Sequence, residues 1–282
     1  MTRFWKYQGT GNDFILIDNR DGRSEMSSKF TLRICDRHFG IGADGVAYIV
    51  NADDADIGMR SMNSDGSVSE VCGTGLRCVA KHVYDNGIVK GEEFTIRSLH
   101  GIHEVKITAE DGKAELVEVN MGVPVLDCSE IPMVGEGTFI NQIIEVEGER
   151  LLGNALSMGN PHLVIFGGLT ETEKDRFGPI LERIPLFPKR ANVGFASVAD
   201  GKIFLRVYER GAGWTLSCGT GACAAAVAAA VNDLVPYDTP IDVKLPGGWL
   251  KVTVAKDMGK VTVTGPAVLV YEGDISGGQI GK

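Results

Sequence analysis

The sequence predicts an α+β protein built from two copies of one structural unit. Strand-like runs alternate with a few helix-like segments along the 282 residues, and both halves show the same order of elements. The tetrapeptide Cys-Gly-Thr-Gly occurs at residues 72–75 and again at 218–221, an offset of 146. Gly-Asn before an apolar strand occurs at 11–12 and at 159–160, an offset of 148. Landmarks repeated at nearly one offset indicate an internal duplication.

The expected elements follow the chain in the same order in each copy. In the first copy we expect strands at 14–18, 46–50, 57–62, 93–97, 103–108 and 114–120, and helices at 28–38 and 75–86. In the second copy we expect strands at 163–166, 193–198, 203–209, 241–245, 250–255 and 260–264, and helices at 171–184 and 220–232. We therefore expect an N-terminal lobe of residues 1–121, to which segment 266–282 returns, and a C-terminal lobe of residues 122–265.

Composition excludes several classes of partner. A net charge of −9 argues against nucleic acid and anionic membranes, which bind basic surfaces. The N-terminus has no signal-peptide pattern, and no apolar run of about 18 residues predicts a membrane span. The cysteines at 35, 72, 78, 128, 218 and 223 show no zinc-site spacing. We therefore expect a cytoplasmic protein with reduced thiols, four of which (35, 78, 128 and 223) belong to the core.

The two repeated cysteines are the candidate catalytic groups. Cys72 and Cys218 each lie between a strand and a helix, so we expect them at helix N-termini. The helix dipole is expected to lower the pKa of such a thiol from about 8.5 toward neutrality, and the neighbouring N–H groups can hold a carboxylate. Two thiols on opposite faces of one α-carbon can remove a proton from one face and return one to the other. The duplication therefore predicts an amino-acid epimerase.

The sequence resembles the diaminopimelate epimerase family along essentially its whole length. The motifs that carry the resemblance are Gly11-Asn12-Asp13-Phe14, Asn63-Ser64-Asp65-Gly66, Cys72-Gly73-Thr74-Gly75, Gly159-Asn160-Pro161-His162, Asn192-Val193, Glu209-Arg210-Gly211 and Cys218-Gly219-Thr220-Gly221. The resemblance implies two pseudo-symmetric lobes, each a mostly antiparallel sheet wrapped around a central helix. It also implies epimerisation of L,L-diaminopimelate to meso-diaminopimelate in lysine and peptidoglycan precursor synthesis, with no metal and no organic cofactor.

The resemblance also implies a role for each site residue. It makes Cys72 and Cys218 the acid–base pair and places His162 and Glu209 beside the reacting centre, although either of the latter, alone, would more often be a structural hydrogen-bond partner. It implies substrate contacts from Asn12, Asn63, Gly73, Thr74, Asn160, Asn192, Glu209, Arg210, Gly219 and Thr220. Neutral amides can pair with ammonium and carboxylate groups alike, and Arg210 offers a two-pronged contact for the distal carboxylate. The expected partner is diaminopimelate, with no nucleic acid, no membrane, and a homodimer as one option for the assembly.

Two residues depart from the pattern of the family. Thr74 stands where the family usually has Asn, and Trp214 stands where it often has an acidic residue. The matching position in the second copy is Thr220, so the loop itself should accept threonine. Both departures concern the fit of the substrate rather than the chemistry. His100 and His103 are expected to be surface or turn residues rather than a metal pair.

Three other functions compete with this one. A proline racemase or a phenazine-pathway isomerase of the same double fold is disfavoured, because these families lack Glu209-Arg210 together with the paired amides. A catalytically silent ligand-binding protein is disfavoured by the intact cysteine pair. A redox protein that joins Cys72 to Cys218 is a third option, although we interpret such oxidation as a liability of the empty enzyme.

Overall fold

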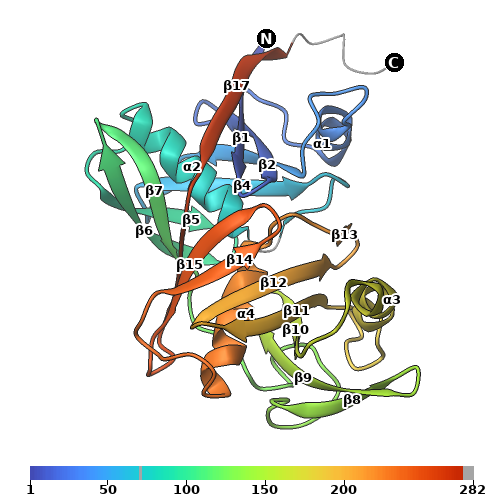
Figure 1. The fold of residues 1–282 in the computed structure, drawn as a ribbon. Helices are drawn as coiled ribbons and strands as arrows, with labels where there is room; N and C mark the ends of the chain where they lie inside the picture. The colour runs from blue at the N-terminus through green and yellow to red at the C-terminus, as the bar shows by residue number, and fades with distance from the viewer. Residues whose placement is uncertain (70–71, 276–282) are drawn as a thin grey trace. The chain divides into compact units, whose positions relative to one another are not determined.

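The computed structural model of the chain describes residues 1–69 and 72–275. The chain divides into two units (Figure 1). Unit 1 comprises Met1–Val119 and the segment from Gly265 onward, and unit 2 comprises Asn120–Thr264. The sequence analysis placed these two changeovers after residues 121 and 265. Residues 276–282 of the expected returning segment lie outside the described residues.

Unit 1 contains a mostly antiparallel sheet. Its strands are β1 (Thr2–Gly9), β2 (Asn12–Asp18), β3 (Gly45–Val50), β4 (Ile57–Asn63), β5 (Glu93–Ser98), β6 (Gly101–Glu110), β7 (Lys113–Asn120) and β17 (Val268–Ile275), and its helices are α1 (Ser28–Cys35) and α2 (Gly73–Asp85). Hydrogen bonding gives the order β17-β1-β2-β3-β4-β5-β6-β7, in which only β2–β3 and β4–β5 are parallel. In Figure 1, β17 runs beside β1, although the two strands come from opposite ends of the chain.

Unit 2 repeats this arrangement. Its strands are β8 (Gln142–Val146), β9 (Glu149–Ser157), β10 (Pro161–Phe166), β11 (Asn192–Ala199), β12 (Lys202–Glu209), β13 (Gly213–Trp214), β14 (Ile241–Leu245), β15 (Gly248–Val254) and β16 (Val261–Gly265), and its helices are α3 (Glu171–Glu182) and α4 (Gly219–Val231). The order is β8-β9-β10-β11-β12-β14-β15-β16, with β10–β11 and β12–β14 parallel. The parallel pairs fall at the same places as in unit 1, so the predicted duplication and fold class are confirmed.

Each sheet packs around one central helix. Both α2 and α4 are 13 residues long, and each begins directly after a repeated cysteine. In α4 every residue from Gly219 to Ala230 is buried, and most of them are alanine, whose small side chain lets the sheet approach the helix from all sides. α2 ends at its C-cap Asn86, followed by Gly87 with φ +66°, a left-handed conformation that glycine adopts without strain.

Two sequence-based assignments need correction. The first helix ends at Cys35 rather than His38, because Asp36 leaves the helical conformation and its carboxylate accepts hydrogen bonds from the backbone N–H groups of His38 and Phe39. His103 is not a surface residue: it is 5% exposed on β6, with Nε2 2.8 Å from Ser98 Oγ, whereas His100 is exposed as expected. In the described ranges no group of three or more His, Cys, Asp and Glu side chains is placed to hold a metal ion.

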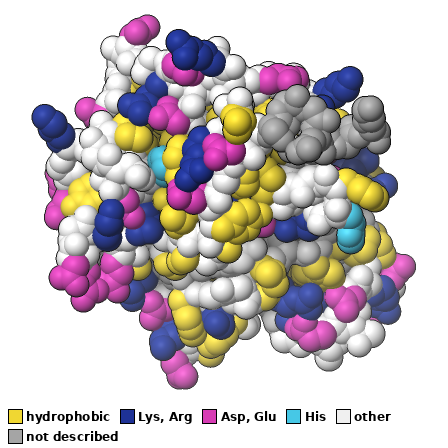
Figure 2. All heavy atoms as spheres, turned by 90° about the horizontal axis from the view of Figure 1, so that it is seen from above, with side chains coloured by type: hydrophobic (Ala, Val, Ile, Leu, Met, Phe, Trp, Pro, Cys, Tyr) yellow, Lys and Arg dark blue, Asp and Glu magenta, His cyan; other side chains and the backbone are white. Residues whose placement is uncertain are grey.

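The distribution of charged side chains and the burial of the cysteines are consistent with what the composition predicts. On the face drawn in Figure 2, acidic and basic side chains are interspersed, with apolar side chains between them. The six cysteines, all within the described residues, form no disulfides with one another, and all are buried except Cys72, which is half-buried. The core positions expected for the other four thiols outside the repeat are therefore confirmed. No helix within residues 1–69 and 72–275 is long and apolar enough to cross a membrane.

A buried histidine makes the stability of unit 1 depend on pH. His82 on α2 is 1% exposed, its ring centroid lies 4.5 Å from that of Trp5, and burial lowers its pKa to about 4. A histidine with a lowered folded-state pKa contributes stability that is fully present above about pH 6.5 and is lost as the pH falls toward 4, since the unfolded chain binds the proton first.

We expect His82→Gln to remove this dependence. Between pH 7 and pH 5 the wild type should lose about 2 kcal/mol more of its free energy of unfolding than the variant does. Urea unfolding curves at the two pH values measure the difference. The matched control is His38→Gln, which changes an exposed histidine and should leave the pH dependence of the wild type intact. If the wild type and His82→Gln lose the same free energy of unfolding between pH 7 and pH 5, His82 is not the source of the pH dependence.

Candidate active site

The two repeated cysteines are the N-caps of the two central helices. Cys72 Sγ accepts the backbone N–H of Gly75 at 3.1 Å, and Cys218 Sγ accepts that of Gly221 at 3.4 Å. Both cysteines have extended backbones, with φ −130° and ψ 96° for Cys72 and φ −132° and ψ 109° for Cys218. Each sulfur therefore satisfies one of the helix donors that have no partner within the helix. The expected position of both thiols at helix N-termini is confirmed.

Glycine at the third helical position makes room for each sulfur. A Cβ added at Gly75 would lie 3.3 Å from Cys72 Sγ. A Cβ added at Gly221 would lie 3.2 Å from Cys218 Sγ and 3.1 Å from Val207 Cγ2. All three separations are tighter than ordinary van der Waals contacts, so an added side chain would displace the sulfur or its neighbours. The second glycine of each Cys-Gly-Thr-Gly is thus explained by the cap itself.

In unit 2 a chain of polar side chains leads to Cys218. His162 Nε2 donates to Asn160 Oδ1 at 2.9 Å, and Asn160 Nδ2 donates to Thr220 Oγ1 at 3.3 Å. Thr220 Oγ1 lies 3.5 Å from Cys218 Sγ. The structure therefore brings four of the sequence-predicted site residues into one hydrogen-bonded chain. The sequence places them far apart, at the start of β10 and at the start of α4.

His162 is held as a neutral imidazole. It is 1% exposed, and burial together with the nearby charge of Arg210 lowers its pKa to about 3. Because its Nε2 donates to Asn160, the Nδ1 atom carries the lone pair, and Nδ1 has no hydrogen-bond partner in the described part of the chain. A neutral ring fixed in one tautomer can orient Asn160, but it does not supply an imidazolium acid at neutral pH.

Asn192 fixes the backbone that leads to Arg210. Its Oδ1 accepts the Arg210 N–H at 3.0 Å, and its Nδ2 donates to the carbonyl of Pro161 at 3.3 Å. The carboxamide is 4% exposed and joins β10 to the end of β12. Arg210 Nη1 also donates to the Lys189 carbonyl at 3.4 Å. These hydrogen bonds hold both the backbone and the guanidinium of Arg210 in place, in the same unit as Cys218.

The pKa of Cys218 is raised well above the ordinary value for a thiol, contrary to the expectation from the helix dipole. Burial is the main cause, and the negative charge of Glu209 is the second. The hydrogen bonds from Thr220 and from the Gly221 backbone act in the opposite direction but are weaker. Glu209 Oε1 accepts a hydrogen bond from Thr215 Oγ1, which helps to hold the carboxylate in place. Burial and the charge of Glu209 thus favour the neutral thiol of Cys218.

Unit 1 holds the other predicted residues, Asn12, Asn63, Gly73 and Thr74. Thr74 is 1% exposed and lies against Gly9, since a Cβ at Gly9 would be 3.0 Å from Thr74 Cγ2. Gly9 is paired with Asn12 across the β1–β2 turn. Asn63 ends β4 beside Gly45 and donates from Nδ2 to Ser67 Oγ at 2.9 Å. These contacts link the first turn of α2 to the β1–β2 turn that holds Asn12, and Asn63 to the start of β3.

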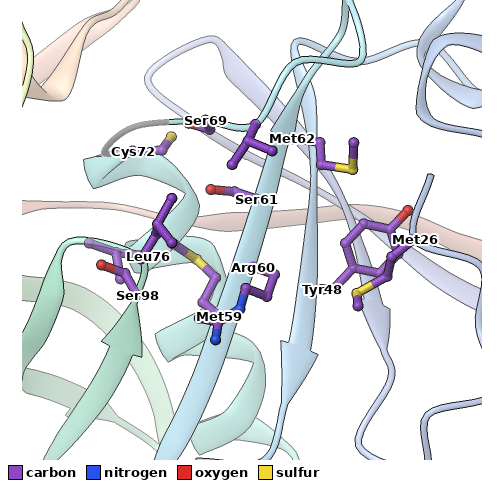
Figure 3. A pocket seen from close by; sticks show the side chains of 12 residues that line it. Met26, Tyr48, Met59, Arg60, Ser61, Met62, Ser69, Cys72, Leu76 and Ser98 are labelled. Carbon is purple, nitrogen blue, oxygen red and sulfur yellow. The ribbon is translucent and has the colours of Figure 1, made fainter. Parts of the chain in front are cut away.

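A cavity of about 220 Å³ in unit 1 adjoins Cys72 (Figure 3). The residues that line it are mostly apolar: Met26, Tyr48, Met59, Arg60, Ser61, Met62, Val68, Ser69, Cys72, Leu76, Ser98 and Leu99. Figure 3 shows Cys72 at the first turn of α2, at the margin of this set. Such a lining does not suit a ligand with two ammonium and two carboxylate groups. The cavity gives Cys72 an apolar flank, which the sequence analysis did not anticipate.

Trp214 packs within unit 2. Its ring lies 4.1 Å from the guanidinium carbon of Arg206, and its centroid lies 5.3 Å from Tyr208 and 5.8 Å from Phe195. These contacts are aromatic and cation–π in kind. The unusual residue at position 214 is therefore accounted for by packing on β11 and β12.

We expect Glu209→Gln to lower the pKa of Cys218, because the substitution removes the nearby negative charge. At pH 8 the rate at which iodoacetamide modifies Cys218 should rise about three- to tenfold. Mass spectrometry of peptide fragments measures this rate separately for Cys218 and Cys223. Glu145→Gln, an exposed change on β8, is the matched control and should leave the rate unchanged. A slower or unchanged rate in Glu209→Gln would show that the carboxylate does not suppress ionisation of the thiol.

The chain is similar to known proteins along nearly its whole length. The sequence model described as diaminopimelate epimerase matches residues 4–126 and 154–270. A diaminopimelate epimerase from Desulfovibrio desulfuricans is 42% identical over 281 residues, covering 96% of this chain and 97% of the relative. One from Acetivibrio thermocellus is 41% identical over 276 residues, covering 97% and 98%.

Solved structures share the fold at low sequence identity. A probable proline racemase from Agrobacterium radiobacter K84 superposes with a TM-score of 0.73 at 15% identity, covering 98% of this chain and 93% of that one. A PhzF-family phenazine biosynthesis protein from Bacillus anthracis gives a TM-score of 0.68 at 17% identity, covering 98% and 99%. These structures show the fold, and the curated relatives show the family. The chain belongs to the diaminopimelate epimerase family and is an amino-acid epimerase, an isomerase.

Proposed function

We propose that this chain interconverts L,L- and meso-diaminopimelate, using Cys72 and Cys218 as an acid–base pair on opposite faces of one α-carbon. The observation that carries the proposal is the repeated cap: each unit supplies one thiol, at the same place in its fold, bonded to the third N–H of its central helix. Membership of the diaminopimelate epimerase family supports diaminopimelate as the substrate. This reaction would supply meso-diaminopimelate for lysine and peptidoglycan precursor synthesis.

The proposed reaction conserves the protons of the thiol pair. A thiolate takes the α-proton from one face of the substrate and becomes a neutral thiol. The electron pair left on carbon is shared with the adjacent carboxylate, whose growing charge is stabilised by the N–H groups at the helix N-termini. The other thiol then gives its proton to the opposite face and becomes the thiolate. The pair begins and ends with one proton, now on the other sulfur, so the reverse reaction uses the same groups.

The surrounding residues bind and orient in this scheme. The N–H groups of Gly73 and Thr74, and of Gly219 and Thr220, are candidates to hold the carboxylate at the reacting centre. Arg210 would hold the distal carboxylate, with the amides of Asn12, Asn63, Asn160 and Asn192 completing the set. Glu209 would control the protonation of Cys218, and neutral His162 would hold Asn160 in place. In unit 2, the hydrogen-bonded chain from His162 through Asn160 to Thr220, the bond from the Arg210 N–H to Asn192, and the charge of Glu209 beside Cys218 support these roles.

We also propose that the enzyme works in the cytoplasm as a homodimer. The six free cysteines support a reducing compartment. Strand β17 supports self-association, since Val268, Leu269, Val270 and Tyr271 are each more than 40% exposed in succession along it.

We expect Cys72→Ala and Cys218→Ala each to lower epimerisation to about 1% of the wild-type rate or less, because each removes one of the two proton-transfer groups. The assay incubates L,L-diaminopimelate in deuterated water and follows stereochemistry and α-deuterium by NMR. In the first turnover deuterium should enter only at the centre that is inverted. The matched controls, Cys78→Ala and Cys223→Ala, change fully buried thiols in the same two helices and should keep most of the activity. Full activity in either Cys72→Ala or Cys218→Ala would refute the two-thiol mechanism.

Arg210 is expected to select substrates with a distal carboxylate. Arg210→Lys should lower kcat/KM for diaminopimelate about 10- to 100-fold, because the lysine ammonium cannot form the bidentate hydrogen bonds that a guanidinium makes with a carboxylate. The wild type should turn over lysine, which lacks that carboxylate, far more slowly than diaminopimelate. Arg176→Lys, on the exposed side of α3, is the control. Equal turnover of lysine and diaminopimelate by the wild type would rule out this role.

A further inference from the structure

Four charged side chains form a compact network at the start of β2 and β3 in unit 1. Lys6 Nζ lies 2.6 Å from Asp13 Oδ2, and the Lys6 side chain is only 6% exposed. Arg37 bridges two carboxylates, since its Nη2 lies 2.7 Å from Asp13 Oδ1 and 2.7 Å from Asp44 Oδ1. The two cations balance the two carboxylates, so the network is neutral as a whole. Neither Asp44 nor Arg37 was singled out by the sequence motifs.

Asp44 connects this network to Asn12. Its Oδ2 accepts a hydrogen bond from Asn12 Nδ2 at 2.8 Å and another from the Asp13 backbone N–H at 3.0 Å. Its backbone carbonyl accepts from Ser64 N–H at 3.0 Å, one residue after Asn63. A single residue thus contacts the side chain of one candidate binding amide and the backbone next to another.

The charge of Asp44 decides which way the Asn12 carboxamide faces. A carboxylate only accepts hydrogen bonds, so the NH₂ group must point toward Asp44 and the opposite orientation would set oxygen against oxygen. Asn12 Oδ1 is thereby turned away from the network. No hydrogen bond to Asn12 Oδ1 occurs among residues 1–69 and 72–275, and Asn12 is half-buried at the turn beside Gly9. The group it offers to a ligand is therefore an acceptor.

We propose that Asp44 is a positioning residue that locks the Asn12 carboxamide with its oxygen toward the substrate, so that Asn12 recognises an ammonium group rather than a carboxylate. This inference rests on the proposed function, because it assigns one of the four charged groups of a diamino diacid to a named atom. The negative charge of Asp44 behind the amide favours the same partner. Arg37 in turn holds Asp44 in place through its other carboxylate oxygen.

The test is a double-mutant cycle between Asp44→Asn and Asn12→Ala, with diaminopimelate as the substrate. Asp44→Asn allows the Asn12 amide to turn over, so KM should rise about tenfold while kcat changes by less than about threefold, as expected for lost binding shared by ground state and transition state. In the Asn12→Ala background, Asp44→Asn should have no further effect on KM. If Asp44 has only a structural role, the increases in KM caused by Asp44→Asn and Asn12→Ala should multiply in the double variant. That result would overturn the proposal.

Two controls separate the possible failures. Asp54→Asn breaks a comparable aspartate–arginine pair, with Arg97, elsewhere in unit 1 and should leave KM unchanged. If thermal unfolding shows that Asp44→Asn does not fold at the assay temperature, the same cycle is run with Asp44→Glu, which keeps the charge but displaces the acceptor. No epimerisation by the wild type would refute the proposed function itself. An active wild type with multiplying effects would refute only the role of Asp44.

Discussion

The capping bond between a cysteine sulfur and the third N–H of a buried helix is the constraint on which the rest of each unit depends. A Cβ on the third residue would crowd each sulfur, which favours Gly75 and Gly221 at these positions. Each helix begins directly after its cysteine, and most of its residues are buried. Burial then strengthens every interaction at the cap but makes an isolated thiolate costly. The same enclosure that organises the site raises the pKa of Cys218.

The two copies share this cap but differ in the charges around it. Asn63 and Glu209 each lie nine residues before their cysteine, so a neutral amide in unit 1 corresponds to a carboxylate in unit 2. Unit 2 connects its thiol to a neutral histidine through Thr220 and Asn160. Unit 1 instead has an apolar cavity beside Cys72, and an ion-pair network that contacts Asn12. Duplication thus supplied equal geometry, and later substitutions made the two environments electrostatically unequal.

Sequence reasoning succeeded where a local pattern determines the structure. The caps, the central helices and most strands could be predicted, because apolar periodicity and Gly signals are properties of neighbouring residues. The sequence analysis does not predict strands β1, β8, β9, β13 and β17. In β17 the apolar run from Val268 to Tyr271 is a strand signal in the sequence, but its pairing with β1 at the other end of the chain is not a local property. The pKa of Cys218, the burial of His103 and the role of Asp44 depend on side chains brought in from distant segments, which no local pattern encodes.

The outer strand of each sheet shows how the duplication was adapted. In unit 2 the strand beside β9 is β8, which comes just before it in the chain. In unit 1 the equivalent place beside β1 is taken by β17, from the other end of the chain. The sheet of unit 1 therefore cannot be completed until the last strand has been synthesised, whereas all strands of unit 2 are available earlier. Unit 1 is consequently joined to unit 2 by two chain crossings, near residues 119 and 265, rather than by one. A double connection restricts the motions open to two units more than a single linker does, which would suit the two-thiol reaction proposed above.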